Sequence, residues 1–170
     1  QRIEQYVAMA LQYIRLQETG ADLNIGPCDV YEITKQVLKK YKTAFIEQKL
    51  SIEFEEFAYT AVTDEKWLEF LIDQILSNAV KYTKAGGLTI SCRQCEDTCE
   101  LAIRDTGIGI REEDLPRIFE KGYTGYNGHM DTRSTGIGLY LCKKTADMLG
   151  IRIRVESKLQ EGTTVYLTIM

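Results

Sequence analysis

The chain has 170 residues, of which 44% are hydrophobic and 27% charged, a composition that fits one folded domain rather than a disordered segment. Its net charge of −4 gives no reason to expect nucleic acid or an anionic membrane surface as a partner. No apolar run reaches the roughly 18 residues that a membrane span requires. The sequence starts within a helical pattern, so we expect a fragment of a longer protein.

The five cysteines are an odd number, which disfavours a complete disulfide framework and favours a reducing compartment. Cys92, Cys95 and Cys99 flank a predicted turn, so a zinc site is one possibility. Three positions separate Cys92 from Cys95, and an unbroken strand would direct their side chains to opposite faces. Free thiols that pack as small hydrophobic groups are therefore the favoured prediction, and a metal role stays open.

The first 27 residues predict a helix followed by a linker. Residues 1–18 repeat apolar side chains at spacings of four, three and four, which is the pattern of a coiled-coil seam. So short a helix needs a partner, which is either another helix or the core of this domain. Residues 19–27 contain two glycines and a proline and predict the linker. The main domain is then expected to span residues 28–170.

The main domain alternates helical and strand patterns. The strongest helix is predicted over 64–83, where Thr63 or Asp64 can cap it. A loop over 120–134 has the length of a lid. The other predicted elements are a helix over 30–48, strands over 50–54, 60–63, 88–95 and 99–104, a short helix or turn over 111–119, a helix over 136–149, and strands over 151–155 and 163–169. This order predicts a two-layer α/β sandwich with three main helices on one face of a mixed, mostly antiparallel sheet.

Two glycine pairs mark a candidate ligand site. One strand runs directly into Asp105, which Gly107 and Gly109 follow, and Gly136 and Gly138 open the helix predicted after the lid. A carboxylate accepts a hydrogen bond from an amine, so Asp105 would select adenine over guanine. The start of a helix presents free N–H groups to phosphates. A simple turn is the alternative for the first glycine pair alone.

Four side chains of the 64–83 helix form a second stripe, apart from its apolar face. They are Gln74, Asn78, Lys81 and Tyr82, and they fall within an arc of about 100°. An amide oxygen such as that of Asn78 can bind a divalent ion, and Lys81 can meet a phosphate charge. Mg²⁺ accepts few protein ligands, so one asparagine suffices. A solvated polar face is the alternative.

Competing nucleotide and hydrolase motifs are missing from the sequence. There is no phosphate-binding Gly-x-x-x-x-Gly-Lys-[Ser/Thr] loop, and neither glycine pair continues to Gly-x-Gly-x-x-Gly. The single histidine, His129, lies in the predicted lid, so a Ser-His-Asp or zinc hydrolase is hard to build.

The ordered motifs resemble the ATP-binding catalytic domain of histidine kinases, a member of the GHKL superfamily. The matching segments over residues 28–170 are Asn78-Ala79-Val80-Lys81-Tyr82 (N box), Asp105-Thr106-Gly107-Ile108-Gly109 (G1 box), Pro116 to Phe119 (F box), Gly136-Ile137-Gly138-Leu139 (G2 box) and Gly162-Thr163-Thr164. The surrounding sequence is most similar to the intramembrane-sensing kinases of Gram-positive bacteria that work with peptide-antibiotic ABC transporters.

The resemblance implies the Bergerat fold, binding of ATP with Mg²⁺, and transfer of the γ-phosphate to a histidine on a helical dimerisation domain. Asn78 and Lys81 would be catalytic, with Asn78 the metal ligand, and Phe119 would anchor the lid. The implied nucleotide-binding residues are Asn78, Lys81, Tyr82, Asp105, Gly107, Gly109, Ile110, Phe119, Arg133, Thr135, Gly136, Ile137, Gly138, Leu139 and Thr163.

The resemblance also implies partners. Residues 1–18 would be the end of a dimerisation helix, the full-length protein a homodimer at the cytoplasmic face of the membrane, and a response regulator and an ABC transporter its partners. No His-Glu pair exists, so the fragment should bind ATP without phosphorylating itself. Gln74 stands where related ATPases of the gyrase, Hsp90 and MutL type carry a general-base glutamate, which favours a kinase. A hydrolytic ATPase of the same fold and a non-catalytic nucleotide-binding regulatory module are the alternatives.

Overall fold

The structure is a computed structural model that describes residues 11, 14, 23–125 and 136–170. Within the helix predicted over 1–18, only Leu11 and Ile14 are described, and both are helical and exposed. The rest of that helix, and most of the predicted lid, lie outside the described residues. In the part of the chain that is described, no helix is both long and apolar enough to cross a membrane.

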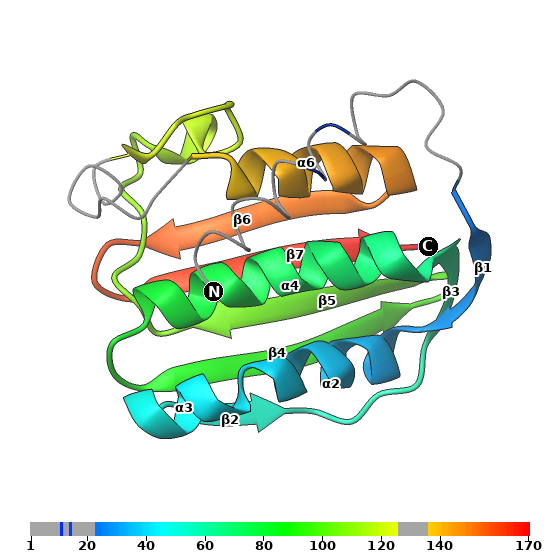
Figure 1. The fold of residues 1–170 in the computed structure, drawn as a ribbon, viewed down its shortest axis with the longest axis horizontal. Helices are drawn as coiled ribbons and strands as arrows, with labels where there is room; N and C mark the ends of the chain where they lie inside the picture. The colour runs from blue at the N-terminus through cyan, green and yellow to red at the C-terminus, as the bar shows by residue number, and fades with distance from the viewer. Residues whose placement is uncertain (1–10, 12–13, 15–22, 126–135) are drawn as a thin grey trace.

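A five-stranded sheet forms one layer of the domain (Figure 1). The parallel pair β2–β4 stands at one edge, and every other neighbouring pair is antiparallel. The predicted mixed, mostly antiparallel sheet is therefore confirmed. Across the sheet the strands are β2 (Ser51–Phe54), β4 (Gly87–Cys95), β5 (Thr98–Asp105), β7 (Gly162–Ile169) and β6 (Arg152–Lys158).

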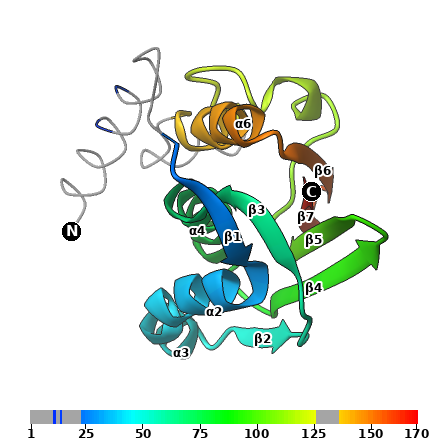
Figure 2. The same cartoon turned by 90° about the vertical axis from the view of Figure 1, so that its right-hand side faces the viewer.

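A separate two-stranded sheet joins the beginning of the domain to the main helix. Strand β1 (Ile25–Asp29) pairs antiparallel with β3 (Thr60–Asp64), and Figure 2 shows the two side by side. Residues 25–27, which the sequence predicted as linker, are thus a strand. Gly26 and Pro27 are tolerated there because β1 is an edge strand. The division of the chain into domains stays a prediction.

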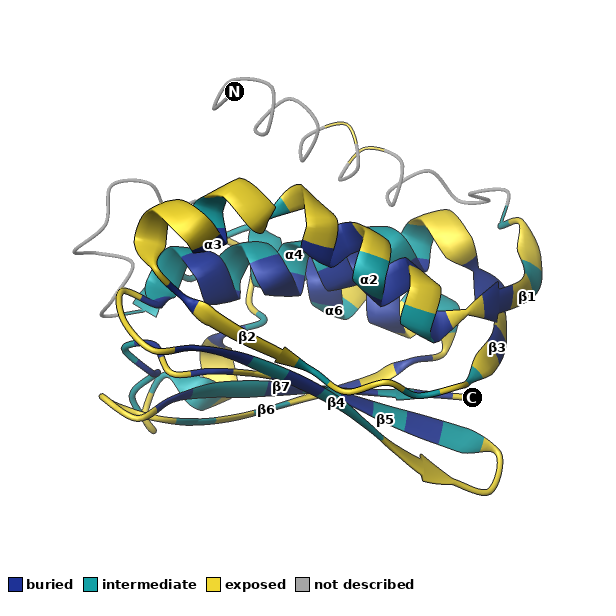
Figure 3. Ribbon diagram, turned by 90° about the horizontal axis from the view of Figure 1, so that it is seen from below, coloured by how far each residue is buried: buried dark blue, intermediate teal, exposed yellow. Residues whose placement is uncertain are grey.

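The helices cover one face of the five-stranded sheet (Figure 3). Helix α4 (Glu65–Tyr82) lies in the middle, with α2 (Val30–Lys40) on one side and α6 (Gly138–Leu149) on the other. Asp64 caps α4, since its Oδ1 accepts the Trp67 N–H at 3.0 Å. The predicted α/β sandwich is confirmed.

The prediction of a single helix over 30–48 is wrong. The segment contains two helices, α2 and α3 (Lys42–Gln48), separated at Tyr41, whose φ of −96° and ψ of 1° leave the helical range. The Tyr41 hydroxyl donates to Asp73 on α4, with 3.1 Å to both the backbone oxygen and Oδ1. The break therefore coincides with a tertiary contact between Tyr41 and α4.

Aliphatic side chains fill the space between the layers. Helix α4 and the three central strands supply fully buried residues, namely Leu68, Leu71, Ile72, Leu76, Ile90, Leu101, Ile103 and Leu167. The segment between β5 and α6 contains only one short 3₁₀ helix among its described residues, η1 (Leu115–Arg117), which includes Pro116. This matches the short helix or turn predicted over 111–119.

Candidate functional site

Asp105 ends β5 on the face of the sheet that the helices cover. It is 8% exposed, and its Oδ1 accepts two backbone N–H bonds, from Gly107 at 2.7 Å and from Thr163 at 3.3 Å. Burial raises the pKa of the Asp105 carboxyl, and the two N–H donors lower it by less. Both bonds from the described residues go to Oδ1, and none of these residues donates a hydrogen bond to Oδ2.

The loop from Asp105 to Ile110, here called the glycine loop, packs backbone against backbone. A Cβ on Gly107 would lie 2.6 Å from the carbonyl oxygen of Tyr82, at the end of α4. Gly109 has a φ of +69° and leaves no space for a Cβ beside the carbonyl of Lys158. These glycines are therefore required by the packing of the loop onto α4 and β6. Their predicted contact with a base stays a prediction.

The polar stripe of α4 faces α6. A Cβ placed on Gly138 would lie 3.6 Å from Oε1 of Gln74 and 4.0 Å from Nδ2 of Asn78. All four members of the stripe are half-buried, so they do not form a solvated polar face. At its C-terminal end, the Lys81 ammonium lies 4.9 Å from the centre of the Tyr82 ring.

Helix α6 begins two residues later than predicted. Gly136 has a φ of +65° and stands outside the helix, Ile137 is the N-cap residue, and Gly138 is the first helical residue. Within the described residues, no side chain caps this N-terminus. The helix dipole favours negative charge at an N-terminus, so this end of α6 suits an anion.

The remaining predicted residues fall into two groups. Phe119 and Leu139 are partly buried and pack against the core, and the Ile110 N–H is bonded to Ser157. Arg133, Thr135 and His129 lie outside the described residues, so the structure says nothing of them. The functional role of every predicted site residue stays a prediction.

Two residues that hold the glycine loop in place were absent from the predicted set of site residues, one within the loop and one beside it. The Thr106 hydroxyl accepts the Gly87 N–H at 3.0 Å and donates to the Ala85 carbonyl at 3.0 Å, which ties the loop to the start of β4. Ser157 bonds to the other end of the loop. The strand predicted over 151–155 runs on to Lys158, and one more step of its alternation would have included Ser157.

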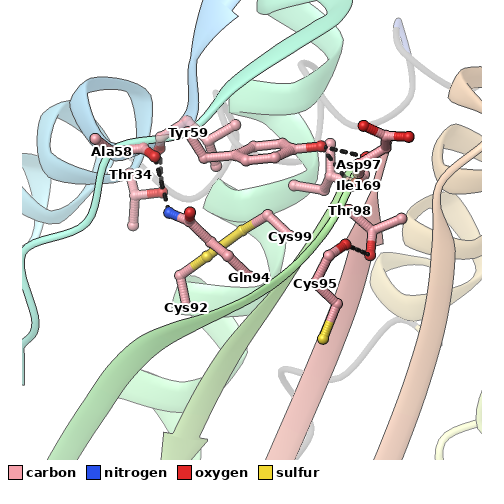
Figure 4. The surroundings of a disulfide bond; sticks show 11 residues. Thr34, Ala58, Tyr59, Cys92, Gln94, Cys95, Asp97, Thr98, Cys99 and Ile169 are labelled. Carbon is pink, nitrogen blue, oxygen red and sulfur yellow. Dashed lines mark hydrogen bonds between the residues drawn. A yellow bond between two sulfur atoms is a disulfide. The ribbon is translucent and has the colours of Figure 1, made fainter.

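The three cysteines around the β4–β5 turn do not form a metal site. Cys92 and Cys99 share the helix-facing side of the sheet, with 6.2 Å between their Cα atoms, and they are joined by a disulfide (Figure 4). Cys95 is exposed, and the described residues contain no group of three or more His, Cys, Asp or Glu that could hold a metal ion. The prediction of free thiols is therefore wrong for Cys92 and Cys99.

Solved structures identify the class of the fold. The crystal structure of full-length ShkA in complex with AMPPNP superposes with a TM-score of 0.82 at 23% identity, over 96% of this chain and 34% of that chain. The catalytic domain of the histidine kinase ThkA superposes with a TM-score of 0.74 at 19% identity, over 86% of this chain and 95% of that chain. At such identities the likeness shows the fold alone, which is that of histidine-kinase catalytic domains.

The family follows from sequence. The model of the family described as histidine kinase-, DNA gyrase B- and HSP90-like ATPase matches residues 63–170, and the chain belongs to this family. It is 36% identical over 167 residues to the sensor protein BceS of Bacillus subtilis, covering 98% of this chain and 50% of the relative. It is 35% identical over 170 residues to the sensor histidine kinase GraS of Staphylococcus haemolyticus, covering 98% and 49%.

The chain spans about half the length of the curated relatives that it matches. Family and relatives together identify it as an ATP-binding domain of the histidine-kinase type, and they favour this interpretation over the two alternatives. The predicted family and fold are confirmed.

Proposed function

We propose that this domain binds Mg-ATP and transfers the γ-phosphate to a histidine on a helical dimerisation domain. The supporting observation is that α4 touches both halves of the candidate site. Its end at Tyr82 contacts the glycine loop, since the Ile108 N–H donates to the Tyr82 carbonyl at 3.2 Å, and its Gln74–Asn78 segment contacts the start of α6. About 12 Å of helix separates Gln74 from Tyr82, a length that suits an extended nucleoside triphosphate.

Base and phosphates would occupy opposite ends of this site. Oδ2 of Asp105 accepts a hydrogen bond from the amine of adenine, which guanine replaces by a carbonyl. The phosphates would lie at the N-terminus of α6, where the helix dipole stabilises negative charge. Lys81 and Tyr82 lie at the glycine-loop end of α4 and would contact the phosphate chain from there.

The residues present fit a magnesium ion. Asn78 offers a hard amide oxygen, is half-buried, and faces the end of α6 where the phosphates are expected. Mg²⁺ keeps several waters and takes few protein ligands beside substrate phosphates, so one asparagine is an adequate donor set. When bound, the ion neutralises charge that develops on the phosphate oxygens.

In the transfer, the bond from the γ-phosphorus to the bridging oxygen of ADP breaks, and a bond from phosphorus to an imidazole nitrogen forms. This domain contributes positioning and electrostatic stabilisation. Gln74 lies beside Gly138, close to the expected phosphates, but a glutamine cannot accept the proton of an attacking water. Little hydrolysis of ATP is therefore expected without the acceptor histidine.

The wider setting of the domain is part of the same proposal. The curated relatives carry the names of sensor kinases, and about half of their length lies outside this chain. We infer that residues 1–18 end the dimerisation helix, that the whole protein is a homodimer at the cytoplasmic face of the membrane, and that a response regulator receives the phosphate. An ABC transporter for peptide antibiotics is the expected partner in sensing.

The test combines this chain with the histidine-bearing domain of the same protein, Mg²⁺ and ATP labelled on its γ-phosphate. The expected product is an acid-labile, alkali-stable phosphohistidine on the helical domain. Asn78→Ala should slow its formation by roughly 100-fold, because charge stabilisation at the phosphates is lost. Asn24→Ala is the matched control, since among the described residues only the backbone N–H of Asn24, and not its side chain, forms a hydrogen bond.

Two outcomes would contradict the proposal. One is ATP binding without any phosphohistidine. The other is steady release of inorganic phosphate by this chain alone at the rate of the complete mixture, which would identify a hydrolytic ATPase.

A further inference from the structure

A row of polar residues, paired across neighbouring strands, lies on the helix-facing side of the sheet at the end nearest the candidate site. Residues directly opposite each other on neighbouring strands share a face. Two rows on this face are aliphatic across β5, β7 and β6, namely Ile103–Val165–Val155 and Leu101–Leu167–Ile153. The next row toward the candidate site is Asp105–Thr163–Ser157. Ser157 is therefore the third member of a row whose other two members are predicted to contact the nucleotide.

The Ser157 hydroxyl is fully engaged in this row. It accepts the Ile110 N–H at 2.8 Å and donates to the Gly162 carbonyl at 2.9 Å, and it lies 2.8 Å from Oγ1 of Thr163. A hydroxyl has one hydrogen to donate and two lone pairs to accept with. With its hydrogen on Gly162, Ser157 accepts from both Ile110 and Thr163, and every position is satisfied.

These bonds connect the glycine loop to the β6–β7 turn. The loop already lies against that turn through its backbone, since the Gln160 N–H donates to the Ile108 carbonyl at 2.8 Å. Ser157 adds a side-chain bond at Ile110, where the loop ends. On its other side it holds Thr163, whose own N–H donates to Oδ1 of Asp105. Ser157 thus acts on both supports of the Asp105 carboxylate without touching it.

We propose that Ser157 is a positioning residue that fixes the glycine loop and Thr163 around Asp105, and so sets the preference of the site for a base with an exocyclic amine. This rests on the proposed function, because it assigns Asp105 to that amine. Loss of the hydroxyl leaves the Ile110 N–H without its acceptor and removes the contact with Oγ1 of Thr163, so the glycine loop and β7 at Thr163 are held less firmly. Asp105 then loses its fixed orientation, and the nucleotide loses the bond that depends on that orientation.

The experiment measures dissociation constants for ATP and for inosine triphosphate, which carries a carbonyl in place of the amine, by calorimetry on the complete chain. Ser157→Ala should weaken ATP binding roughly tenfold, the size expected for one lost hydrogen bond in a half-buried site. Inosine triphosphate should change far less, so the preference for ATP falls by a similar factor. Ser157→Thr keeps the hydroxyl and should restore the preference.

Thr98→Ala is the matched control. It removes a hydroxyl that donates to the Cys95 carbonyl at 3.0 Å, at the opposite end of the same sheet. It should leave both dissociation constants unchanged. Thermal unfolding of each variant without nucleotide shows that the proteins compared are folded, and Ser157→Cys replaces Ser157→Ala if the latter does not fold.

The outcomes separate this proposal from the proposed function. Failure of the wild-type chain to bind ATP would overturn the proposed function. Wild-type binding with an unchanged preference in Ser157→Ala, or an equal loss for both nucleotides, would overturn the role of Ser157 alone. Failure of Ser157→Thr to restore the preference would also overturn it.

Discussion

Asp105 meets opposite requirements from folding and from binding. As a buried carboxylate it loses hydration, and this raises its pKa even though two N–H groups bond to Oδ1. The group therefore costs folding free energy when it is ionised. Binding requires the same charge, because an amine is held better by a carboxylate than by a neutral acid. A role in binding would explain why this destabilising carboxylate is buried.

We expect Asp105→Asn to separate these two effects. The amide can still accept from Gly107 but carries no charge, so the variant without nucleotide should melt about 2 °C higher at neutral pH. ATP affinity should fall roughly tenfold or more, because the charged acceptor is lost. Calorimetric melting and ATP titration measure the two quantities.

The pH dependence of stability shows whether ionisation of Asp105 stabilises or destabilises the folded state. A raised pKa in the folded state means that the contribution of Asp105 is fully present below its unfolded value of about 4 and is lost as pH rises through the folded value. The advantage of the asparagine variant should therefore disappear in acid. A variant that melts lower than wild type at neutral pH and binds ATP equally well would contradict this account.

At the level of elements, the break between α2 and α3 occurs at a residue that contacts another helix. The sequence around Tyr41 contains neither glycine nor proline, and its apolar stripe continues across the break, so periodicity alone predicts one helix. Tyr41 instead leaves the helical conformation, and its hydroxyl reaches Asp73 on α4. Burial raises the pKa of Asp73, while nearby Lys40 and the Tyr41 hydroxyl lower it.

Tyr41→Phe should lower the free energy of unfolding by about 1 kcal/mol, because a half-buried carboxylate loses a donor. The loss should shrink in acid, where Asp73 is protonated and the bond is weaker. Urea unfolding at neutral and acidic pH measures both values. Tyr166→Phe is the control, since its hydroxyl bonds to exposed Glu156 and its removal should change stability by less than about 0.5 kcal/mol. Equal effects of the two changes would contradict a stabilising role for the contact between Tyr41 and Asp73.

At the level of the whole molecule, local sequence patterns predict the two layers of the fold. They do not predict the contacts between segments that are distant in the sequence. The alternation before Asp105 and the periodicity around Asn78 predicted β5 and α4, because both patterns come from burial of one face. The role of Ser157 could not be predicted from the sequence, because it depends on strand pairing with Thr163 and on a contact with the loop at Ile110. Strand β1 was not predicted, because Gly26 and Pro27 are residues typical of a linker.

Strand β1 connects the start of the domain to the helix that carries the candidate site. The Asn24 N–H donates to Oδ2 of Asp64 at 2.7 Å, and Oδ1 of the same carboxylate caps α4. Asp64 is only 4% exposed, so each of its oxygens needs a partner. A domain that starts at residue 28, as the sequence predicted, would lose Asn24 and most of β1, whereas one that starts at residue 23 would keep both.

We therefore expect residues 28–170 to be less stable than residues 23–170 by about 2 kcal/mol, which corresponds to a melting temperature roughly 5 °C lower. Urea unfolding of the two fragments, with the complete chain as reference, measures the difference. ATP affinity of the folded fraction should be equal in both, because β1 contacts neither Asp105 nor the start of α6 in the described part of the chain. Equal stability of the two fragments would show that β1 is dispensable and that the boundary at residue 27 holds. A loss of affinity at equal stability would instead mean that β1 supports the site directly.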